Sequence, residues 1–127
     1  MKYNIKNINI KEIDHLKEMA KKDGILFPKK NFVLLGAYLK DTLVGFGGFV
    51  LKKDSAIIKC DYVIKEYRKQ GVASQLHKIR LGVMKVMGLK YVEANATPMA
   101  LKMHLNSGAR IVNKYKNGIT KVSYENI

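Results

Sequence analysis

Residues 63–76 read Val63-Ile64-Lys65-Glu66-Tyr67-Arg68-Lys69-Gln70-Gly71-Val72-Ala73-Ser74-Gln75-Leu76, and they join a predicted strand to a predicted helix through a turn that contains a glycine. A helix that begins directly after such a turn presents unpaired backbone N–H groups and the positive end of its dipole, which together attract an anion. Gly71 lets the backbone approach a ligand, and Ala73 keeps the first helical turn unobstructed. Arg68 and Lys69 add positive charge to the same turn. The stretch therefore predicts a binding site for a diphosphate.

On both sides of this turn the sequence predicts an α+β fold. Asn9 and Glu12 stand at capping-box positions before apolar residues at helical spacing, which predicts a first helix. Turn-forming residues separate three apolar runs, which is typical of an antiparallel meander. The pair Asn117-Gly118 predicts a type I′ turn in a final hairpin. In chain order we expect a helix over 10–22, strands over 32–39, 43–51 and 56–64, a helix over 71–87, a strand over 91–96, a helix from 97 to 108, and hairpin strands over 111–116 and 119–124, so that helices flank one mixed, mostly antiparallel central sheet.

The spacing of apolar residues also predicts which face of the helix over 71–87 is buried. That face carries Val72, Leu76, Ile79, Val83 and Met87. His77 falls on a polar face by this interpretation, as does His15 in the first helix. Neither histidine has a partner at a spacing that would bind a metal, so we expect no metal site.

Length and composition favour a single globular domain over residues 1–127. Apolar residues make up 47% of the chain and charged residues 27%, which excludes a disordered protein. The single cysteine, Cys60, excludes an internal disulfide and fits a reducing compartment. Residues 1–10 lack the apolar segment of a signal peptide, and the longest apolar run, 43–51, is too short to span a bilayer. We therefore expect a cytoplasmic protein without a membrane segment.

The chain carries a formal net charge of +14, from 24 Lys and Arg against 10 Asp and Glu. Such an excess attracts anionic partners, whether a polyphosphate cofactor, nucleic acid or an acidic surface. Codon bias in an AT-rich genome would produce the same excess, because almost all of it is lysine. The sequence has no aromatic RNP pair and no zinc knuckle, so we expect nucleic acid to bind only through a non-specific basic surface.

The turn resembles motif A of the GNAT superfamily of acyl-CoA-dependent N-acyltransferases, whose pattern is Arg or Gln, two residues, Gly, one residue, and then Gly or Ala. Arg68, Gly71 and Ala73 match this pattern at the right spacing. The motif needs a strand before it and an amphipathic helix after it, and both are predicted here. The resemblance covers roughly residues 43–110 and implies a GNAT-like fold.

A second match lies downstream, in the helix that is predicted to end at Gly108. Ala100, His104 and Gly108 keep the spacing of the family's motif B helix, in which Ala, Tyr and Gly recur four residues apart. The sequence also departs from the family pattern at four places, which are Lys65 instead of a common Pro, Thr97 instead of Asn, His104 instead of Tyr, and Ala109 instead of an aromatic residue. The third departure affects the group that would serve as the leaving-group acid.

The resemblance implies acetyl-CoA as the cofactor. Its pantetheine arm would lie in a splay between the strand that ends near Ile64 and the strand that begins near Tyr91. By this analogy the backbone of Tyr62, Val63 and Ile64 pairs with pantetheine. The implied diphosphate site consists of Arg68, Lys69, Gln70, Gly71, Val72, Ala73 and Ser74.

The implied reaction is direct attack of a neutral amine on the thioester, which needs a base, a donor to the oxyanion and a proton for the thiolate. His104 is the candidate acid, because an unperturbed imidazole pKa near 6.5 gives partial protonation at neutral pH. Glu93 and Asp61 are alternative bases from the two splayed strands. A packing histidine and solvated strand carboxylates are the competing interpretations. Cys60 is interpreted as a core thiol rather than an acyl carrier.

The sequence thus predicts an N-acetyltransferase that acts on a primary amine of an unidentified acceptor, with a protein amine among the candidates. The scarcity of acidic residues argues weakly against polycationic acceptors. The alternative is a catalytically weak CoA-binding or nucleic-acid-binding module on the same fold, since His104 replaces the family's tyrosine.

Overall fold

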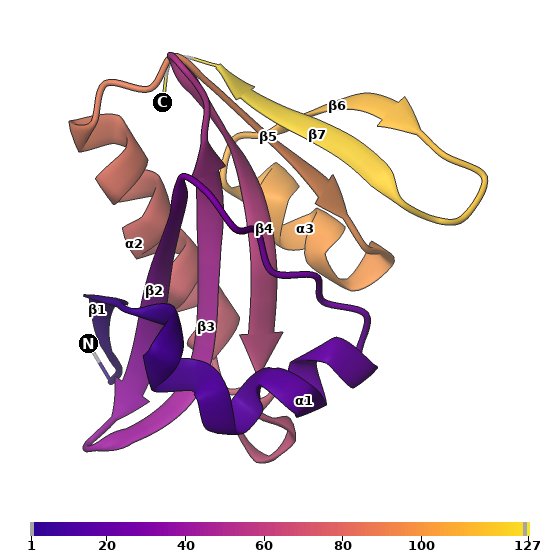
Figure 1. Cartoon of the computed structure of the whole chain (residues 1–127). Coiled ribbons are helices and arrows are strands. Elements are labelled where there is room, and N and C mark those ends of the chain that lie inside the picture. Colours follow the sequence, from indigo (N-terminus) through magenta and orange to yellow (C-terminus); the bar gives the residue numbers. More distant parts are fainter. Residues whose placement is uncertain (1, 126) are drawn as a thin grey trace.

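The computed structural model describes residues 2–125 and 127, and it contains one seven-stranded sheet with strand order β1-β2-β3-β4-β5-β7-β6 (Figure 1). Its elements are β1 (Asn4–Ile8), the 3-10 helix η1 (Ile10–Ile13), α1 (Asp14–Lys22), β2 (Phe32–Leu39), β3 (Thr42–Leu51), β4 (Ser55–Val63), the 3-10 helix η2 (Lys65–Tyr67), α2 (Val72–Val86), β5 (Tyr91–Ala96), α3 (Pro98–Asn106), β6 (Arg110–Lys114) and β7 (Thr120–Glu125). All neighbouring strands are antiparallel except the parallel pair β4 and β5. The predicted α+β architecture is confirmed.

The edge strand β1 was not predicted from the sequence. Asn4–Ile8 reads NIKNI, and most of its side chains are exposed, so it lacks the alternation of a half-buried strand. It pairs with β2 from Asn4 opposite Tyr38 to Ile8 opposite Leu34. Its strand conformation therefore depends on this pairing rather than on local sequence preference.

The final hairpin forms as predicted, but the type I′ turn is wrong. Gly118 has a positive φ of 87°, whereas Asn117 is not among the residues with positive φ, and a type I′ turn requires both. The Gly118 N–H donates to Tyr115 O at 3.2 Å, and the Tyr115 N–H donates to Ile119 O at 2.9 Å, which closes a three-residue loop. The Asn117 side chain accepts from the Ile119 N–H at 3.0 Å, an Asx-type contact that replaces the left-handed conformation.

The sheet separates two helical layers. Helix α1 covers one face of β2 to β4, and α2 and α3 cover the opposite face (Figure 1). The core under α1 includes Ile13, Leu16 and Phe46, while the core under α2 and α3 includes Phe49 and Met84. None of the described helices is long and apolar enough to cross a membrane.

The buried face of α2 differs from the prediction. The structure buries Val72, Leu76, His77, Arg80 and Met84, which follow the helical period through two polar residues. Met87 is 45% exposed instead of buried. His77, which was predicted on a polar face, is 1% exposed. The error arose because only apolar residues were counted as core, whereas this face packs polar partners from β4, β7 and α3.

Candidate active site

The parallel strands β4 and β5 pair only at their beginnings. The paired residues are Ser55 with Tyr91, Ala56 with Val92, and Ile57 with Glu93. Beyond these positions β4 continues to pair with β3, and β5 continues to pair with β7 (Figure 1). The facing edges of β4 and β5 therefore carry backbone groups that are not used by the sheet, as the sequence resemblance implied.

A bulge in β4 sets the direction of the side chains along the splay. Cys60 has a positive φ of 68°, and both Cys60 and Asp61 lie between the pairs that flank Gly47 of β3. The Cys60 thiol consequently donates to Leu26 O at 3.2 Å, on the α1 side, while Asp61 turns toward α2. A Cβ at Gly47 would lie 2.6 Å from Asp61 Oδ1, so only glycine leaves room for this carboxylate.

Cys60 is half-buried rather than part of the core. Burial, followed by the neighbouring charge of Asp61, raises the pKa of its thiol to about 11, against the opposing effect of Lys59. The thiol is therefore protonated at neutral pH, and a protonated thiol is a poor nucleophile.

The turn before α2 has the conformation that an anion site requires. Gly71 is the N-cap of α2 with a φ of 87°, and no side chain caps this helix end. A Cβ at Gly71 would meet no atom within 4 Å, so the approach to the backbone is open. The Tyr3 hydroxyl donates to Gln70 O at 2.9 Å, and the Gln70 side chain donates to Glu66 O at 3.0 Å. The first N–H groups of α2 are thus held in place without a protein acceptor from a capping side chain.

Arg68 already has protein partners. Its Nε donates to Val63 O at 2.8 Å, and its Nη2 lies 3.3 Å from Asp23 Oδ2. Its guanidinium also lies 5.6 Å from the centre of the Tyr62 ring. Arg68 therefore joins the end of β4 to the loop after α1, and Lys69 is a second exposed cation of the turn.

A hollow of about 470 Å³ lies between α2 and α3, on the face of the sheet opposite α1. Its lining residues are Ser74, Lys78, Leu81, Met103, Asn106 and Ser107. Ser74 belongs to the first turn of α2, so the hollow continues directly from the predicted anion site. Its volume is in the range of small-molecule sites, which is about 300 to 1,000 Å³.

Five side chains form a polar network that extends from β4 to α3 behind the sheet. Arg80 binds both carboxylate oxygens of Asp61, with 2.9 Å between Nη2 and Oδ2, and its Nη2 lies 2.7 Å from His77 Nδ1. His77 Nε2 lies 2.8 Å from the Tyr124 hydroxyl, which in turn lies 2.5 Å from His104 Nδ1. Arg80, His77, Tyr124 and His104 are each at most 3% exposed.

This burial changes the protonation of the histidines. Desolvation, then the charge of Arg80, then His104 lower the pKa of His77 to about 3, against an opposing effect of Asp61. Burial is also the largest cause that lowers the pKa of His104, with Asp61 opposing it and Arg80 adding to it. The sequence argument used an unperturbed pKa near 6.5 for His104. The folded protein instead favours neutral imidazoles at neutral pH.

Glu93 lies on the other face of the sheet. Its β5 neighbours Val92 and Ala94 face the helices, so the alternation of a strand directs Glu93 away from His104. Glu93 Oε2 lies 3.3 Å from Lys121 Nζ and accepts a hydrogen bond from the Tyr91 hydroxyl at 3.3 Å. Of the three candidate catalytic residues, the structure brings Asp61 and His104 into one network and leaves Glu93 outside it.

Three members of the network, His77, Arg80 and Tyr124, were not identified from the sequence. The signal for Arg80 was available, since Leu76 and Arg80 are four residues apart on the face that begins with Val72. A charged residue at such a position indicates a buried partner. Nothing local to β7 identifies Tyr124, because its partners come from α2 and α3.

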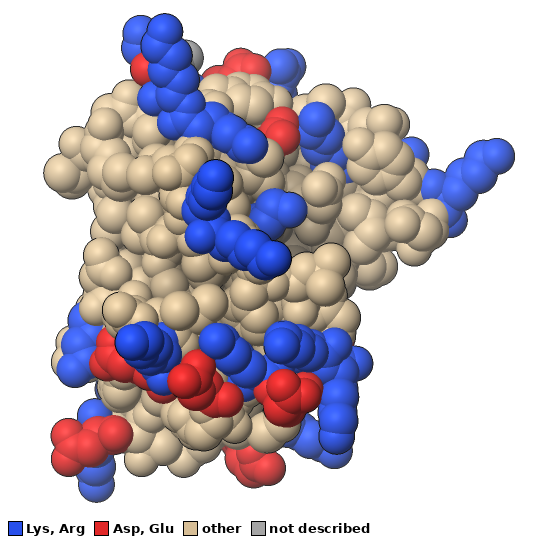
Figure 2. Space-filling view, in the orientation of Figure 1, with Lys and Arg blue, Asp and Glu red and all other residues tan. Residues whose placement is uncertain are grey.

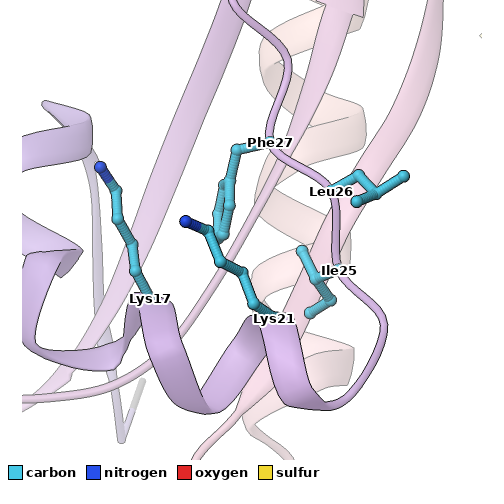
Figure 3. Close-up of a pocket in the computed structure, with 5 residues that line it drawn as sticks. All are labelled: Lys17, Lys21, Ile25, Leu26 and Phe27. Carbon is cyan, nitrogen blue, oxygen red and sulfur yellow. The ribbon is translucent and has the colours of Figure 1, made fainter.

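A second hollow, of about 410 Å³, lies on the α1 side of the sheet (Figure 3). Lys17, Lys21, Ile25, Leu26 and Phe27 line it, and the two lysines extend from α1 alongside the Phe27 ring. The Cys60 to Leu26 hydrogen bond attaches this loop to the β4 bulge. The two hollows therefore lie on opposite faces of the sheet, each next to β4 or its connections.

The basic charge does not form a continuous stripe on the α1 face. Figure 2 shows that Lys and Arg alternate with Asp and Glu along the band formed by α1. Two pairs of these oppositely charged side chains on α1 form ion pairs, Lys17 with Asp14 at 3.1 Å and Lys21 with Glu18 at 3.9 Å. Over residues 2–125 and 127, no group of three or more His, Cys, Asp or Glu side chains is placed to hold a metal ion.

Comparison with known proteins supports the same fold. The PaiA N-acetyltransferase of Thermoplasma acidophilum, solved with coenzyme A, has a TM-score of 0.78 and 14% identity over 98% of this chain and 99% of its own. The ribosomal-protein-S18-alanine N-acetyltransferase of Escherichia coli has a TM-score of 0.78 and 11% identity over 97% and 93%. A GNAT family acetyltransferase of Elizabethkingia anophelis, solved with acetyl-CoA bound, has a TM-score of 0.73 and 16% identity over 98% of each chain. No curated protein matches the sequence.

At these identities the solved structures show a shared fold and no more. The family is shown by the sequence profile of the acetyltransferase (GNAT) family, which matches residues 5–107. The matched region contains both splayed strands, the turn at Gly71 and all but one member of the polar network. The chain therefore belongs to the acetyltransferase (GNAT) family.

Proposed function

We propose that this protein transfers the acetyl group of acetyl-CoA to a primary amine. The observation that carries the proposal is the open start of α2 after Gly71, which follows directly from the strand at the splay. Such a helix start binds phosphate through its backbone N–H groups and its dipole. Family membership supports the same ligand, because two GNAT-fold relatives were crystallised with coenzyme A or acetyl-CoA.

In this proposal the diphosphate lies against the turn of residues 68–74, beside the hollow between α2 and α3. Pantetheine pairs with the free edge of β4. The Ile64 N–H already donates to Val44 O at 2.9 Å, and Val63 O accepts from Arg68. The edge groups left for pantetheine therefore lie closer to Tyr62 and the bulge than to Ile64.

The two catalytic tasks fall on opposite faces of the sheet. The amine attacks the thioester carbonyl from the α1 side. There Glu93 Oε2 binds Lys121 and Tyr91, and Oε1, which has no partner among the described residues, accepts the proton of the amine. Asp61 is a weaker candidate for this task, because Arg80 binds both of its oxygens. We assign the base to Glu93.

His104 serves the leaving thiolate from the helix side. Because its pKa is lowered, the neutral ring donates a hydrogen bond to the sulfur, and the thiolate takes its proton from solvent. The carbon–sulfur bond breaks as the carbon–nitrogen bond forms, and the proton of the attacking amine goes to Glu93. This is a hydrogen-bonding role rather than the full proton transfer of an imidazolium acid.

The acceptor that we propose is a primary amine with few additional positive charges, such as a protein amine. The hollow on the α1 side carries Lys17 and Lys21 at its edge, and these repel polycations (Figure 3). Thiol release from acetyl-CoA, measured with a panel of amines and paired with mass spectrometry of the product, tests the activity. CoA binding by calorimetry without thiol release on any amine would favour the alternative of a catalytically weak CoA-binding module.

A further inference from the structure

A chain of hydrogen bonds reaches His104 from the Arg80 guanidinium, which can only donate. Arg80 Nη2 lies 2.7 Å from His77 Nδ1, and His77 Nε2 lies 2.8 Å from the Tyr124 hydroxyl. The same hydroxyl lies 2.5 Å from His104 Nδ1. All four side chains are buried, so the position of each proton follows from the donors and acceptors of the chain itself.

Arg80 fixes the direction of the first two hydrogen bonds. A guanidinium has no acceptor, so His77 Nδ1 must accept, and the neutral ring then carries its proton on Nε2. The doubly protonated ring is disfavoured, because burial and the charge of Arg80 lower the pKa of His77 to about 3. His77 Nε2–H therefore donates to the Tyr124 oxygen.

Tyr124 must then place its own proton elsewhere. The two acceptors within reach are His104 Nδ1 at 2.5 Å and the His104 backbone oxygen at 3.4 Å. The longer contact is outside the usual O–H···O range of about 2.5 to 3.0 Å. The hydroxyl therefore donates to Nδ1, and the neutral ring of His104 carries its proton on Nε2.

The Nε2 atom of His104 remains available to a ligand. Within residues 2–125 and 127, no protein group forms a hydrogen bond with it, and only Arg80 Nε and Ser123 Oγ are fully buried side-chain polar atoms without a partner. The hydrogen bonds of the network use only the Nδ1 side of this ring. The ring thus presents one N–H toward the outside of the network and uses its other nitrogen inside.

We propose that Arg80, His77 and Tyr124 are positioning residues that hold His104 in the tautomer with its proton on Nε2, so that this N–H is ready to donate to the leaving sulfur. The second half of this statement rests on the proposed function, which gives His104 its ligand. The tautomer does not rest on it. It is a property of the protein without cofactor and can be measured separately from turnover.

Long-range proton–nitrogen NMR of the wild-type protein without cofactor tests the assignment. We expect an N–H-type signal for His104 Nε2 and an acceptor-type signal for Nδ1, identified by their loss in His104→Ala. His77 should show the same pattern, because it also accepts at Nδ1. A wild-type His104 with its proton on Nδ1 overturns the proposal, whatever the behaviour of any variant.

Tyr124→Phe removes only the hydroxyl of the relay. We expect the His104 Nδ1 signal to lose its hydrogen-bond shift and a second tautomer of His104 to appear. We also expect kcat to fall about tenfold, which corresponds to about 1.4 kcal/mol, while CoA affinity stays within a few-fold of wild type. His104 signals that coincide with those of wild type would overturn the positioning role. His77→Gln should preserve the wild-type pattern at His104, because an amide also offers one acceptor and one donor.

Tyr38→Phe is the matched control, because it removes a hydroxyl from a half-buried tyrosine of β2 that lies outside the network and beside Lys6. It should leave both the His104 signals and kcat unchanged, and a change equal to that in Tyr124→Phe would overturn the specific role of Tyr124. Failure of the proposed function would appear differently, as no thiol release from acetyl-CoA with any amine while the nitrogen signals of the wild-type protein remained as assigned. A His104→Ala variant that turns over at the wild-type rate would instead refute the role of His104 at the leaving sulfur.

Discussion

Asp61→Asn should destabilise the protein through the charge that it leaves behind. The Arg80 side chain is 0% exposed and that of Asp61 is 39% exposed, so the substitution leaves a guanidinium in the interior without its counter-ion. The remaining acceptors of Arg80 are His77 Nδ1 and Gly48 O, the latter at 3.4 Å. Removing one partner of a buried pair costs about 3 to 5 kcal/mol. Because Asp61 is partly solvated and asparagine keeps one oxygen, we expect about 3 kcal/mol, a large share of a typical total of about 5 to 15 kcal/mol.

Urea unfolding followed by circular dichroism measures this loss as a lower midpoint at constant slope. Glu125→Gln is the matched control, since it breaks the Arg110 to Glu125 pair, which has the same 2.9 Å separation but side chains that are 71% and 47% exposed. That control should lose less than about 1 kcal/mol. Asp61→Leu combined with Arg80→Met should lose less than Asp61→Asn, because no charge remains buried. A loss in Asp61→Asn no greater than in Glu125→Gln would refute this account of the ion pair.

Three further outcomes are expected. Gly71→Glu places a carboxylate and a left-handed non-glycine residue at the open helix start, so CoA binding should be lost. Unchanged CoA affinity by calorimetry in a folded variant would contradict the diphosphate site. His104→Ala should lower kcat about 10²-fold and leave CoA affinity within a few-fold of wild type, because the variant loses one hydrogen-bond donor to a developing charge. An unaltered rate, with chemistry shown to be rate-limiting, would make His104 a packing residue. The unfolded chain protonates His77 near pH 6.5 and the folded chain near pH 3. The contribution of His77 to the free energy of unfolding should therefore fall as pH is lowered through this window, by up to about 1.4 kcal/mol per pH unit, and stay level above it. Urea titrations of wild type and His77→Gln with parallel pH dependence would contradict this.

Local sequence was sufficient wherever one element alone determined the structure. The bounds of β2 and β5 match the prediction, because each is an apolar run between turn residues. The turn at Gly71 was identified because the motif that it matches requires a strand, a glycine and a helix in direct succession. The same information indicated the family, which is confirmed, and it predicts the position of the cofactor site.

Other features depend on partners that are distant in the sequence. Whether Asp61 or Cys60 faces α2 is decided by one extra residue in β4, and a bulge of this kind leaves no local signal. Our proposal of Glu93 rather than Asp61 as the base depends on that orientation, because it brings Asp61 to Arg80. His77 was predicted on a polar face, and Arg80 was not singled out, because a sequence does not show the partners from β7 and α3 that surround His77 in the interior.

The hydrogen bond from the Tyr3 hydroxyl to Gln70 O connects the edge of the sheet to the turn before α2. This contact couples the opening of the edge strand to the order of a turn that lies 67 residues away in the sequence. Strand β1 has neighbours on one side only, so it is among the segments expected to open first in local fluctuations. Each opening releases Gln70 and loosens the helix start that we propose as the phosphate site. By linkage, a ligand that needs the ordered turn must in turn slow the opening of β1. Amide hydrogen exchange in this edge strand should therefore report on occupancy of the proposed phosphate site, to which the strand itself contributes no ligand.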